Sequence, residues 1–118
     1  MVKPNFDVNF LEGAFDFLKE LDEKTYNKII YNVDKARYIN DPKLFKKLRD
    51  DIWEFRTKYA GLQYRLLAFW DKSTSLQTLV IATHGIVKKT DKMPENEINK
   101  AVEIKKQYLA QQLKLKKK

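Results

Sequence analysis

The sequence contains no cysteine and a single histidine, His84. The absence of cysteine excludes a disulfide framework, a thiolate zinc site and a cysteine nucleophile. One histidine cannot supply the several imidazole ligands of a histidine metal site within the chain. We therefore expect no metal and no other cofactor, so any chemistry must come from the remaining polar side chains.

Long hydrophobic runs and glycine-rich loops are also lacking. No segment approaches the roughly 20 consecutive apolar residues of a membrane-spanning helix. The first ten residues have no apolar run and include Asp7, so they are unlike a signal peptide. The chain has only three glycines and no glycine-rich phosphate loop. These absences predict a cytoplasmic protein with no membrane partner.

Positive charge is what the chain has in excess. Its 118 residues, which predict one domain spanning 1–118, carry a net charge of +8. A domain this basic tends to bind nucleic acid or another polyanion, although its lysines could also serve solubility alone. Arginine is more informative than lysine, because its planar guanidinium matches a phosphate with two parallel hydrogen bonds. The arginines are Arg37, Arg49, Arg56 and Arg65.

Hydrophobic periodicity predicts a mixture of strands and helices, because a period of two indicates a strand and a spacing of three to four indicates a helix. Strands are expected at 6–11, 52–59, 62–70 and 76–87. Three helices are expected: one at 12–21, one that begins at the N-cap Asp22 and ends at a break at 40–42, and one that begins at Pro94. A further helical turn is expected at 42–48, and a frayed basic tail at about 113–118.

This order, β-α-α-β-β-β-α, predicts an α+β fold. We expect the N-terminal strand and a helical hairpin to pack on one face of an antiparallel sheet, with the helices all on that face and a C-terminal helix at the end. The pair Ala60 and Gly61 is expected to form the turn between two of the strands.

Alternation gathers cations on one side of the predicted sheet. Glu54, Arg56 and Lys58 share a strand face opposite the aromatic side chains, and Arg65 follows across the turn. If the helices cover the aromatic side, the charged side faces solvent. Two lysines, Lys88 and Lys89, end the last strand. Since neighbouring residues of a strand point to opposite faces, only one of the two can join this charged patch.

Such a patch suits the cleavage of RNA, in which the substrate supplies its own 2′-hydroxyl nucleophile and the protein binds the phosphate and moves protons. The plainer interpretations are that Arg56 simply pairs with Glu54 and that His84 is structural. The candidate catalytic residues are Arg56, Arg65, His84, Lys88 and Lys89, and the candidate RNA-binding residues are Glu54, Lys58 and Lys92.

Four ordered motifs carry a resemblance to a known family. They are Trp53-Glu54-Phe55-Arg56, Tyr64-Arg65, the run His84-Gly85-Ile86-Val87-Lys88-Lys89-Thr90, and Pro94-Glu95-Asn96-Glu97-Ile98. Together they resemble the HigB-like, phage-derived branch of the RelE/ParE toxin superfamily. Ile86 stands where that branch usually has phenylalanine, and Met93 where it usually has threonine.

The resemblance implies a type II toxin, a ribosome-dependent endoribonuclease that cleaves mRNA and stops translation. It also implies three partners: the ribosome, mRNA and a HigA-like helix-turn-helix antitoxin. A tyrosine that serves the active site of RelE has no placed equivalent, because Tyr108 falls within the last helix. A ParE-like gyrase inhibitor, a non-catalytic nucleic-acid-binding protein and a degenerate toxin are the alternatives. We expect Arg65→Ala to abolish toxicity without unfolding the protein, because the side chain should face solvent.

Overall fold

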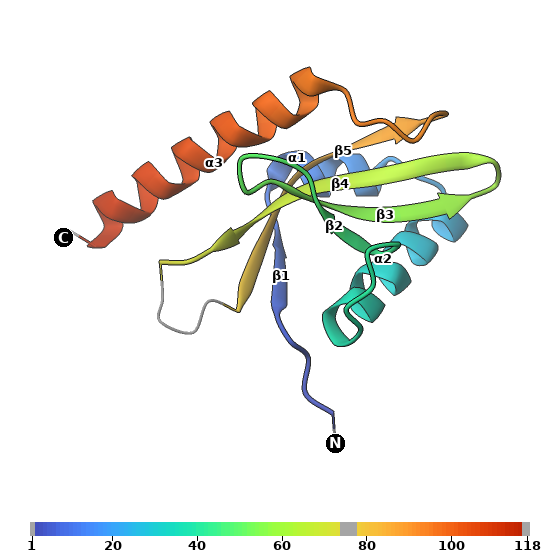
Figure 1. Ribbon diagram of the computed structural model, residues 1–118, viewed down its shortest axis with the longest axis horizontal. Coiled ribbons are helices and arrows are strands. Elements are labelled where there is room, and N and C mark those ends of the chain that lie inside the picture. Colours follow the sequence, from blue (N-terminus) through green and yellow to red (C-terminus); the bar gives the residue numbers. More distant parts are fainter. Residues whose placement is uncertain (1, 74–77, 117–118) are drawn as a thin grey trace.

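The computed structural model describes residues 2–73 and 78–116 (Figure 1). Its elements are β1 (Asp7–Phe10), α1 (Glu12–Lys19), α2 (Glu23–Tyr38), β2 (Phe45–Lys47), β3 (Trp53–Tyr59), β4 (Leu62–Asp71), β5 (Leu79–Lys88) and α3 (Glu95–Lys116). The five strands form one sheet in the order β1-β5-β4-β3-β2. The predicted α+β fold, with its helical hairpin, sheet and C-terminal helix, is confirmed.

The structure differs from the predicted order in one element and one pairing. The segment 42–48, expected to be helical, makes a turn and then the short strand β2, which pairs antiparallel with β3. The N-terminal strand β1 pairs with β5 in parallel, so the sheet is mixed and not wholly antiparallel. Both differences depend on partners distant in sequence, which local periodicity does not reveal. Part of the expected strand at 76–87, residues 76 and 77, lies outside the described residues.

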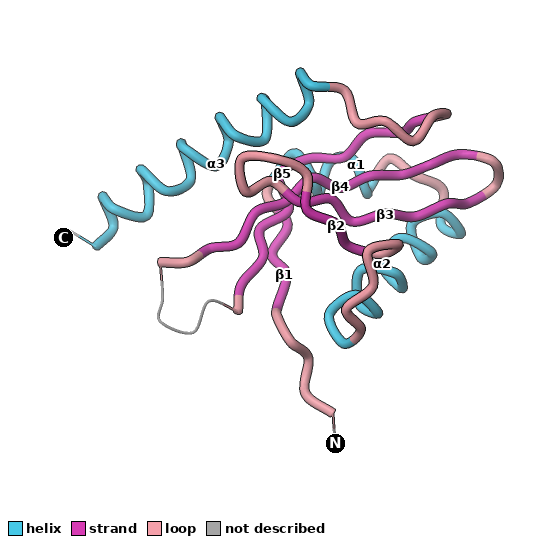
Figure 2. Tube along the Cα trace, in the orientation of Figure 1, coloured by secondary structure: helices cyan, strands magenta, loops and turns pink. Residues whose placement is uncertain are grey.

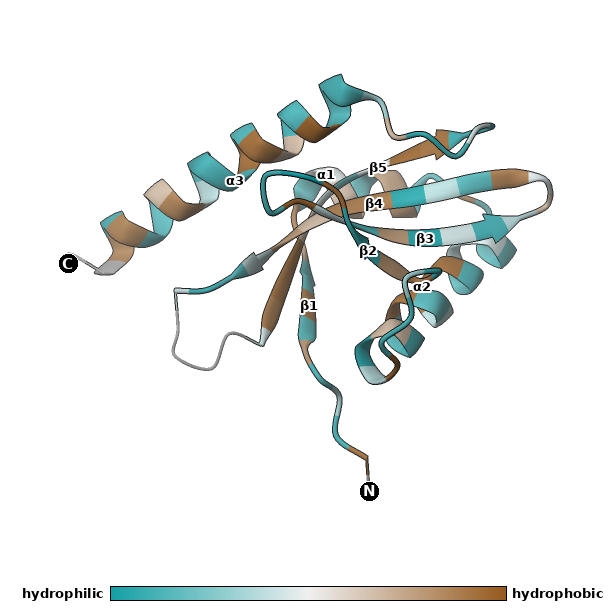
Figure 3. Ribbon diagram, viewed as in Figure 1, coloured by the Kyte–Doolittle hydropathy of each residue, from teal (hydrophilic) through white to brown (hydrophobic). Residues whose placement is uncertain are grey.

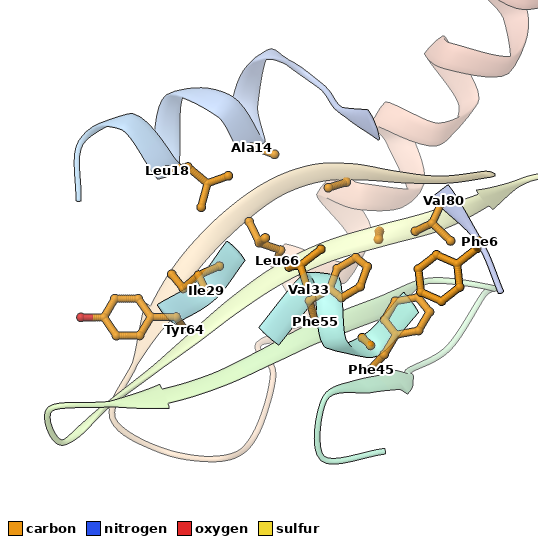
Figure 4. Close-up of a cluster of buried hydrophobic side chains, with 13 residues drawn as sticks. Phe6, Ala14, Leu18, Ile29, Val33, Phe45, Phe55, Tyr64, Leu66 and Val80 are labelled. Carbon is orange, nitrogen blue, oxygen red and sulfur yellow. The ribbon is translucent and has the colours of Figure 1, made fainter. Parts of the chain in front are cut away.

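The helices lie on both faces of the sheet, which corrects the expectation that they share one face. Helices α1 and α2 cover one face, where Phe45, Phe55 and Leu66 belong to a large buried cluster (Figure 4). Helix α3 covers the other face, where Ile98 and Ala101 pack with a second cluster. Figure 2 shows α3 separated from α1 and α2 by the strands. Each face therefore has its own core, and a polar residue on either face can become buried.

Local signals in the sequence explain where α2 and α3 begin. The carboxylate of Asp22 accepts hydrogen bonds from the backbone N–H of Thr25 at 3.2 Å and from its hydroxyl at 2.6 Å. This is the expected N-cap of α2. Glu95 and Glu97 lie in the first turn of α3, next to the positive end of the helix dipole. Along α3, hydrophilic and hydrophobic residues alternate around the helix (Figure 3).

Helix α1 approaches β5 closely because two glycines leave room. A Cβ atom at Gly13 would lie 2.8 Å from the carbonyl oxygen of Thr83. A Cβ atom at Gly85 would lie 2.3 Å from the ring of Phe17. The ring of Phe17 thus occupies the space that a side chain at position 85 would need. This contact fixes the distance between α1 and the strand that carries His84 and Lys88.

We predict that Gly85→Ala lowers the free energy of unfolding by about 1–3 kcal/mol, because the new methyl group overlaps the ring of Phe17. Urea denaturation followed by circular dichroism measures the effect. Combining Gly85→Ala with Phe17→Leu should recover part of the loss, since leucine removes the atoms in conflict. An unchanged denaturation midpoint in Gly85→Ala would show that α1 moves aside freely.

Candidate functional site

Three rows of paired residues cross β3, β4 and β5 on the face covered by α3. Residues opposite one another in antiparallel strands project to the same face of a sheet. The register therefore places the side chains of each row together. The rows are Glu54–Leu67–His84, Arg56–Arg65–Ile86 and Lys58–Gln63–Lys88. Most of the predicted site residues thus share one face of one sheet.

A β-bulge at Thr83 determines to which face of the sheet the last side chains of β5 project. Leu67 pairs with His84 while the next residue of β4, Ala68, pairs with Ala82, so Thr83 is an extra residue. Before the bulge, Ala82 faces α1 and α2; after it, the side chains of His84 and Lys88 lie in the rows with Glu54 and Lys58. The Thr83 hydroxyl donates to the carbonyl oxygen of Leu67 at 3.2 Å, which holds the bulge in place.

A buried ion pair joins the first two rows. Arg65 Nε lies 3.1 Å from Glu54 Oε1, and the two residues are only 1% and 3% exposed. The prediction that Glu54 and Arg65 face solvent is therefore wrong, because the residues after β5 and the packing of α3 cover this side of the sheet. Burial lowers the pKa of Arg65, and the attraction of Glu54 opposes that shift. The guanidinium is a fixed positive charge inside the protein.

The guanidinium of Arg65 is only partly satisfied. Its Nη2 donates to Gln63 Oε1 and lies 3.8 Å from Asp91 Oδ1. Its buried Nη1 has no hydrogen-bond partner among the described residues. An unpaired buried donor on a cation is costly in free energy, and an anionic ligand would relieve that cost. The arrangement therefore has an unused capacity for an anion.

Arg56 lies beside this pair and is more accessible. Its Nε is 3.7 Å from Glu54 Oε2, its Nη1 donates to the carbonyl oxygen of Pro42 at 3.3 Å, and its side chain is 22% exposed. The plainer expectation that Arg56 pairs with Glu54 thus describes one of its contacts. Because Glu54 faces both arginines, its single negative charge does not neutralise them.

Both arginines line a hollow of about 290 Å³ at the edge of β3, beyond the end of β2. We call it the arginine hollow. Its lining residues are Asn32, Lys43, Leu44, Arg56, Thr57, Lys58 and Arg65. The Nδ2 atom of Asn32 donates to the Thr57 hydroxyl at 3.1 Å, which links α2 to β3 beside the hollow. Lys58 is exposed, as expected for the charged face of its strand.

The structure distinguishes the two lysines that end the last strand. Lys88 is 7% exposed, and its Nζ donates to the carbonyl oxygen of Asp91 at 2.7 Å. Burial, followed by the nearby charge of Arg65, lowers the pKa of Lys88. Lys89 is exposed, as is Lys92 in the loop that leads to α3. Lys88 is therefore the lysine that joins the two arginines.

His84 lies on the same face but is closed off beneath α3. It is 4% exposed; its Nε2 lies 3.4 Å from Glu97 Oε1, and its Nδ1 lies 2.9 Å from the Thr83 hydroxyl. Burial, followed by the charge of Lys100, lowers its pKa. Neither His84 nor Lys88 is among the described residues that line the arginine hollow, but Lys88 lies near the charge of Arg65 whereas His84 contacts Glu97 of α3. Its contacts attach α3 to β5, which matches the structural interpretation of this residue.

Tyr108 also lies away from the arginines. Its hydroxyl donates to Asp71 Oδ2 at 2.6 Å, at the far end of β4. Burial and this hydrogen bond raise the pKa of Tyr108 to about 12. A phenol with so high a pKa is a poor proton acceptor near neutral pH. Tyr108 therefore anchors α3 to the sheet.

Sequence reasoning missed several residues of the site. Asn32, Lys43 and Thr57 line the hollow, and Asp91 contacts Arg65 and Lys88. The side chain of Gln63, followed by the charge of Lys58, lowers the pKa of Asp91. Asn32 and Lys43 belong to segments expected only to pack on the sheet, and no local pattern links them to Arg56. Asp91 has a weak signal, since it is the one acidic residue between Lys88 and Pro94.

Within residues 2–73 and 78–116, no group of three or more histidine, cysteine, aspartate or glutamate side chains could hold a metal ion. In the same part of the chain, no helix combines the length and the apolar composition needed to cross a membrane.

Comparison with protein families identifies residues 16–106 with a family described as phage derived protein Gp49-like (DUF891). The chain belongs to this Gp49-like family. The resemblance to a phage-derived toxin branch is confirmed at that level. A comparison with curated proteins found no match.

The fold of this Gp49-like protein is also found among solved structures. It matches a chain in the crystal structure of the toxin–antitoxin complex RelBE2 from Mycobacterium tuberculosis, with a TM-score of 0.56 and 19% sequence identity. The match covers 76% of the Gp49-like chain and 98% of that chain. At this identity the comparison shows a common fold, and the chemistry of the site must be argued from its own residues.

We predict that Arg65→Ala destabilises the Gp49-like protein by about 3–5 kcal/mol, because it leaves the buried Glu54 carboxylate without its main partner. This replaces the expectation that Arg65→Ala leaves the fold intact. Arg56→Ala should lower stability by less than about 1 kcal/mol, since its ion pair is longer and partly solvated. Urea denaturation compares the two variants.

The double variant Glu54→Leu/Arg65→Met should regain most of the stability lost in Arg65→Ala, because it removes both buried charges together. A double variant as unstable as Arg65→Ala would show that packing, and not the unpaired carboxylate, sets the cost.

We further predict that Lys88 titrates below the ordinary lysine pKa of 10.5, because it is buried next to Arg65. Its folded pKa is lowered, so the charged form of Lys88 opposes folding below that pKa. This opposition fades as the pH rises through the folded pKa toward 10.5. NMR titration of the Lys88 side chain measures the pKa. A value at or above 10.5 would contradict the prediction.

Proposed function

We propose that this Gp49-like protein is the toxin of a type II toxin–antitoxin system and acts as a ribosome-dependent endoribonuclease on mRNA. The observation that carries the proposal is the buried guanidinium of Arg65, whose Nη1 has no hydrogen-bond partner within residues 2–73 and 78–116 and which lines a hollow with Arg56 and Lys58. Such a site is suited to one phosphodiester group, held by charge and by directed hydrogen bonds.

The proposed reaction uses the 2′-hydroxyl of the RNA as nucleophile. The 2′-oxygen attacks the adjacent phosphorus, and the bond from phosphorus to the 5′-oxygen breaks. The products are a 2′,3′-cyclic phosphate and a free 5′-hydroxyl. The proton lost by the 2′-hydroxyl is gained by the departing 5′-oxygen, so no external reactant is needed.

Arg56 and Arg65 bind the phosphate and stabilise the charge that develops on its oxygens in the transition state. Because Glu54 holds Arg65 in place before substrate binds, little reorganisation is needed during the reaction. Lys88 is the proposed proton carrier, since burial beside Arg65 lowers its pKa and increases the fraction of neutral amine. Lys58 and Lys92, both exposed, contact the RNA backbone in this proposal. Lys89 is left outside the reaction, and His84 is a structural contact to α3.

The proposed partners follow from the same function. The protein would act in the cytoplasm, on mRNA held by the ribosome. A HigA-like helix-turn-helix antitoxin would neutralise it. The presence of a protein with this fold in the toxin–antitoxin complex RelBE2 supports an antitoxin partner.

Cleavage of mRNA by purified protein and ribosomes, mapped by primer extension, tests the function. We predict that Arg56→Ala lowers the cleavage rate by about 100-fold or more, as expected when one donor to a transition-state oxygen is lost. Arg56 is partly exposed, so the variant should remain folded by circular dichroism. Lys24→Ala, which removes an exposed charge on α2, serves as the matched control and should cleave normally.

The remaining outcomes distinguish the alternatives. Intact mRNA with damaged DNA in cells that express the protein would indicate a gyrase inhibitor. Binding of RNA without cleavage would indicate a non-catalytic module. Cleavage at the normal rate by folded Arg56→Ala would overturn the proposed role of the arginine hollow.

A further inference from the structure

A second cationic hollow lies at the other end of β3 and β4. It has a volume of about 210 Å³ and is lined by Lys47, Asp51, Trp53, Trp70, Lys72 and Lys105. We call it the tryptophan hollow. Its residues come from β2, β3, β4, α3 and two loops, so it forms only in the folded protein. None of them lines the arginine hollow.

The charge of the tryptophan hollow is positive. Among the described residues that line it, Asp51 alone is acidic, and Lys47 Nζ lies 3.2 Å from Asp51 Oδ1. The pKa of Asp51 is lowered first by Lys47 and then also by Lys105 and Lys72. One carboxylate thus faces three ammonium groups, which leaves charge available for an anion.

Two indole rings give this hollow an aromatic surface. Trp53 and Trp70 are both half-buried, with ring centroids 6.1 Å apart and planes inclined at 75°. Indoles beside lysines offer both parts of an unpaired nucleotide a partner, because bases stack on aromatic rings while phosphates pair with cations. An acidic peptide would use the lysines but would have no general need for the indoles.

Exposed lysines connect the two hollows. Lys43 lines the arginine hollow, Lys47 lines the tryptophan hollow, and Lys46 lies exposed between them on β2. Arg56 and Trp53 belong to the same strand, and three residues of extended chain span roughly 10 Å. Arg56 and Trp53 project to opposite faces of β3, as Lys46 and Lys47 do on β2, so a polyanion that contacts both hollows would have to pass around the β2 edge of the sheet.

We propose that the tryptophan hollow binds an unpaired segment of RNA, with bases against the indoles and phosphates on Lys72 and Lys105. The inference rests on the proposed action on RNA and extends it by a second contact, away from the scissile phosphate. Its role is to hold the nucleic acid while the arginine hollow acts on one phosphodiester.

The chain provides its own probe, because Trp53 and Trp70 are its two tryptophans. Intrinsic tryptophan fluorescence therefore reports on binding at these indoles. Because both rings also line a neighbouring hollow with Phe6 and Phe45, the lysine variant described next assigns the signal to the tryptophan hollow. The experiment titrates the full-length protein with 2′-O-methyl oligouridine, which lacks the attacking hydroxyl and cannot be cleaved by the proposed reaction. We expect saturable quenching, and little quenching with a duplex of the same length or with polyglutamate.

The variant Lys72→Gln/Lys105→Gln should weaken oligouridine binding about tenfold. It should also reduce the slope of log K against the logarithm of salt concentration by about 1.4 in magnitude, the value for two lost phosphate contacts on a single strand. Lys24→Gln/Lys28→Gln, which removes two exposed charges from α2, is the matched control and should bind normally. Fluorescence that does not respond to saturating oligouridine, equal quenching by polyglutamate, or an equal loss in the control would overturn the inference.

Cleavage assays separate this inference from the proposed function. If the wild-type protein cleaves mRNA on ribosomes but shows no quenching, the proposed nuclease function stands and the inferred second RNA site is wrong. If the protein binds oligouridine at the tryptophans but does not cleave mRNA, the inferred RNA site stands and the proposed nuclease function is wrong.

Discussion

The ion pair between Glu54 and Arg65 is the interaction on which the candidate site depends. It holds a guanidinium inside the protein, where solvent does not screen it, and leaves Nη1 of that group without a hydrogen-bond partner in the described part of the chain. A carboxylate that faces Arg56 as well cannot balance both cations. The hollow therefore stays positive at its inner wall, where a bound phosphate would be most strongly attracted. A solvent-exposed arginine would provide a weaker and less directed field.

The bulge at Thr83 is the second constraint, and it acts through geometry. A regular β5 would keep one alternation throughout, so that His84 and Lys88 would share a face with Val80 and Ala82 and point toward α1 and α2. The extra residue reverses the alternation and places Lys88 with Arg65. The same reversal puts Gly85 under Phe17, where only a glycine fits. One irregularity thus serves both the site and the packing of α1.

Alternation in the sequence was sufficient to predict that Glu54, Arg56, Lys58 and Arg65 share one face, because the period of a strand is a local property. It could not predict that α3 and the segment after Lys88 bury Arg65, since a period of two does not say what covers a face. The choice of Lys88 over Lys89 required the bulge, and the neighbours Asn32 and Lys43 required the tertiary fold. Periodicity supplied the fold class and the family resemblance agreed with it, yet neither assigned burial to any residue.

The parallel pairing of β1 with β5 has a consequence for biosynthesis. Asp7 is made well before its partner Leu79, which belongs to the last strand of the sheet. Contacts between residues so distant in sequence form late and slow folding, because a long loop must close before they yield any stabilisation. The nascent chain therefore lacks a complete sheet, and with it an assembled cluster of cations, until β5 has left the ribosome. The assembled candidate site therefore exists only after β5 has been made.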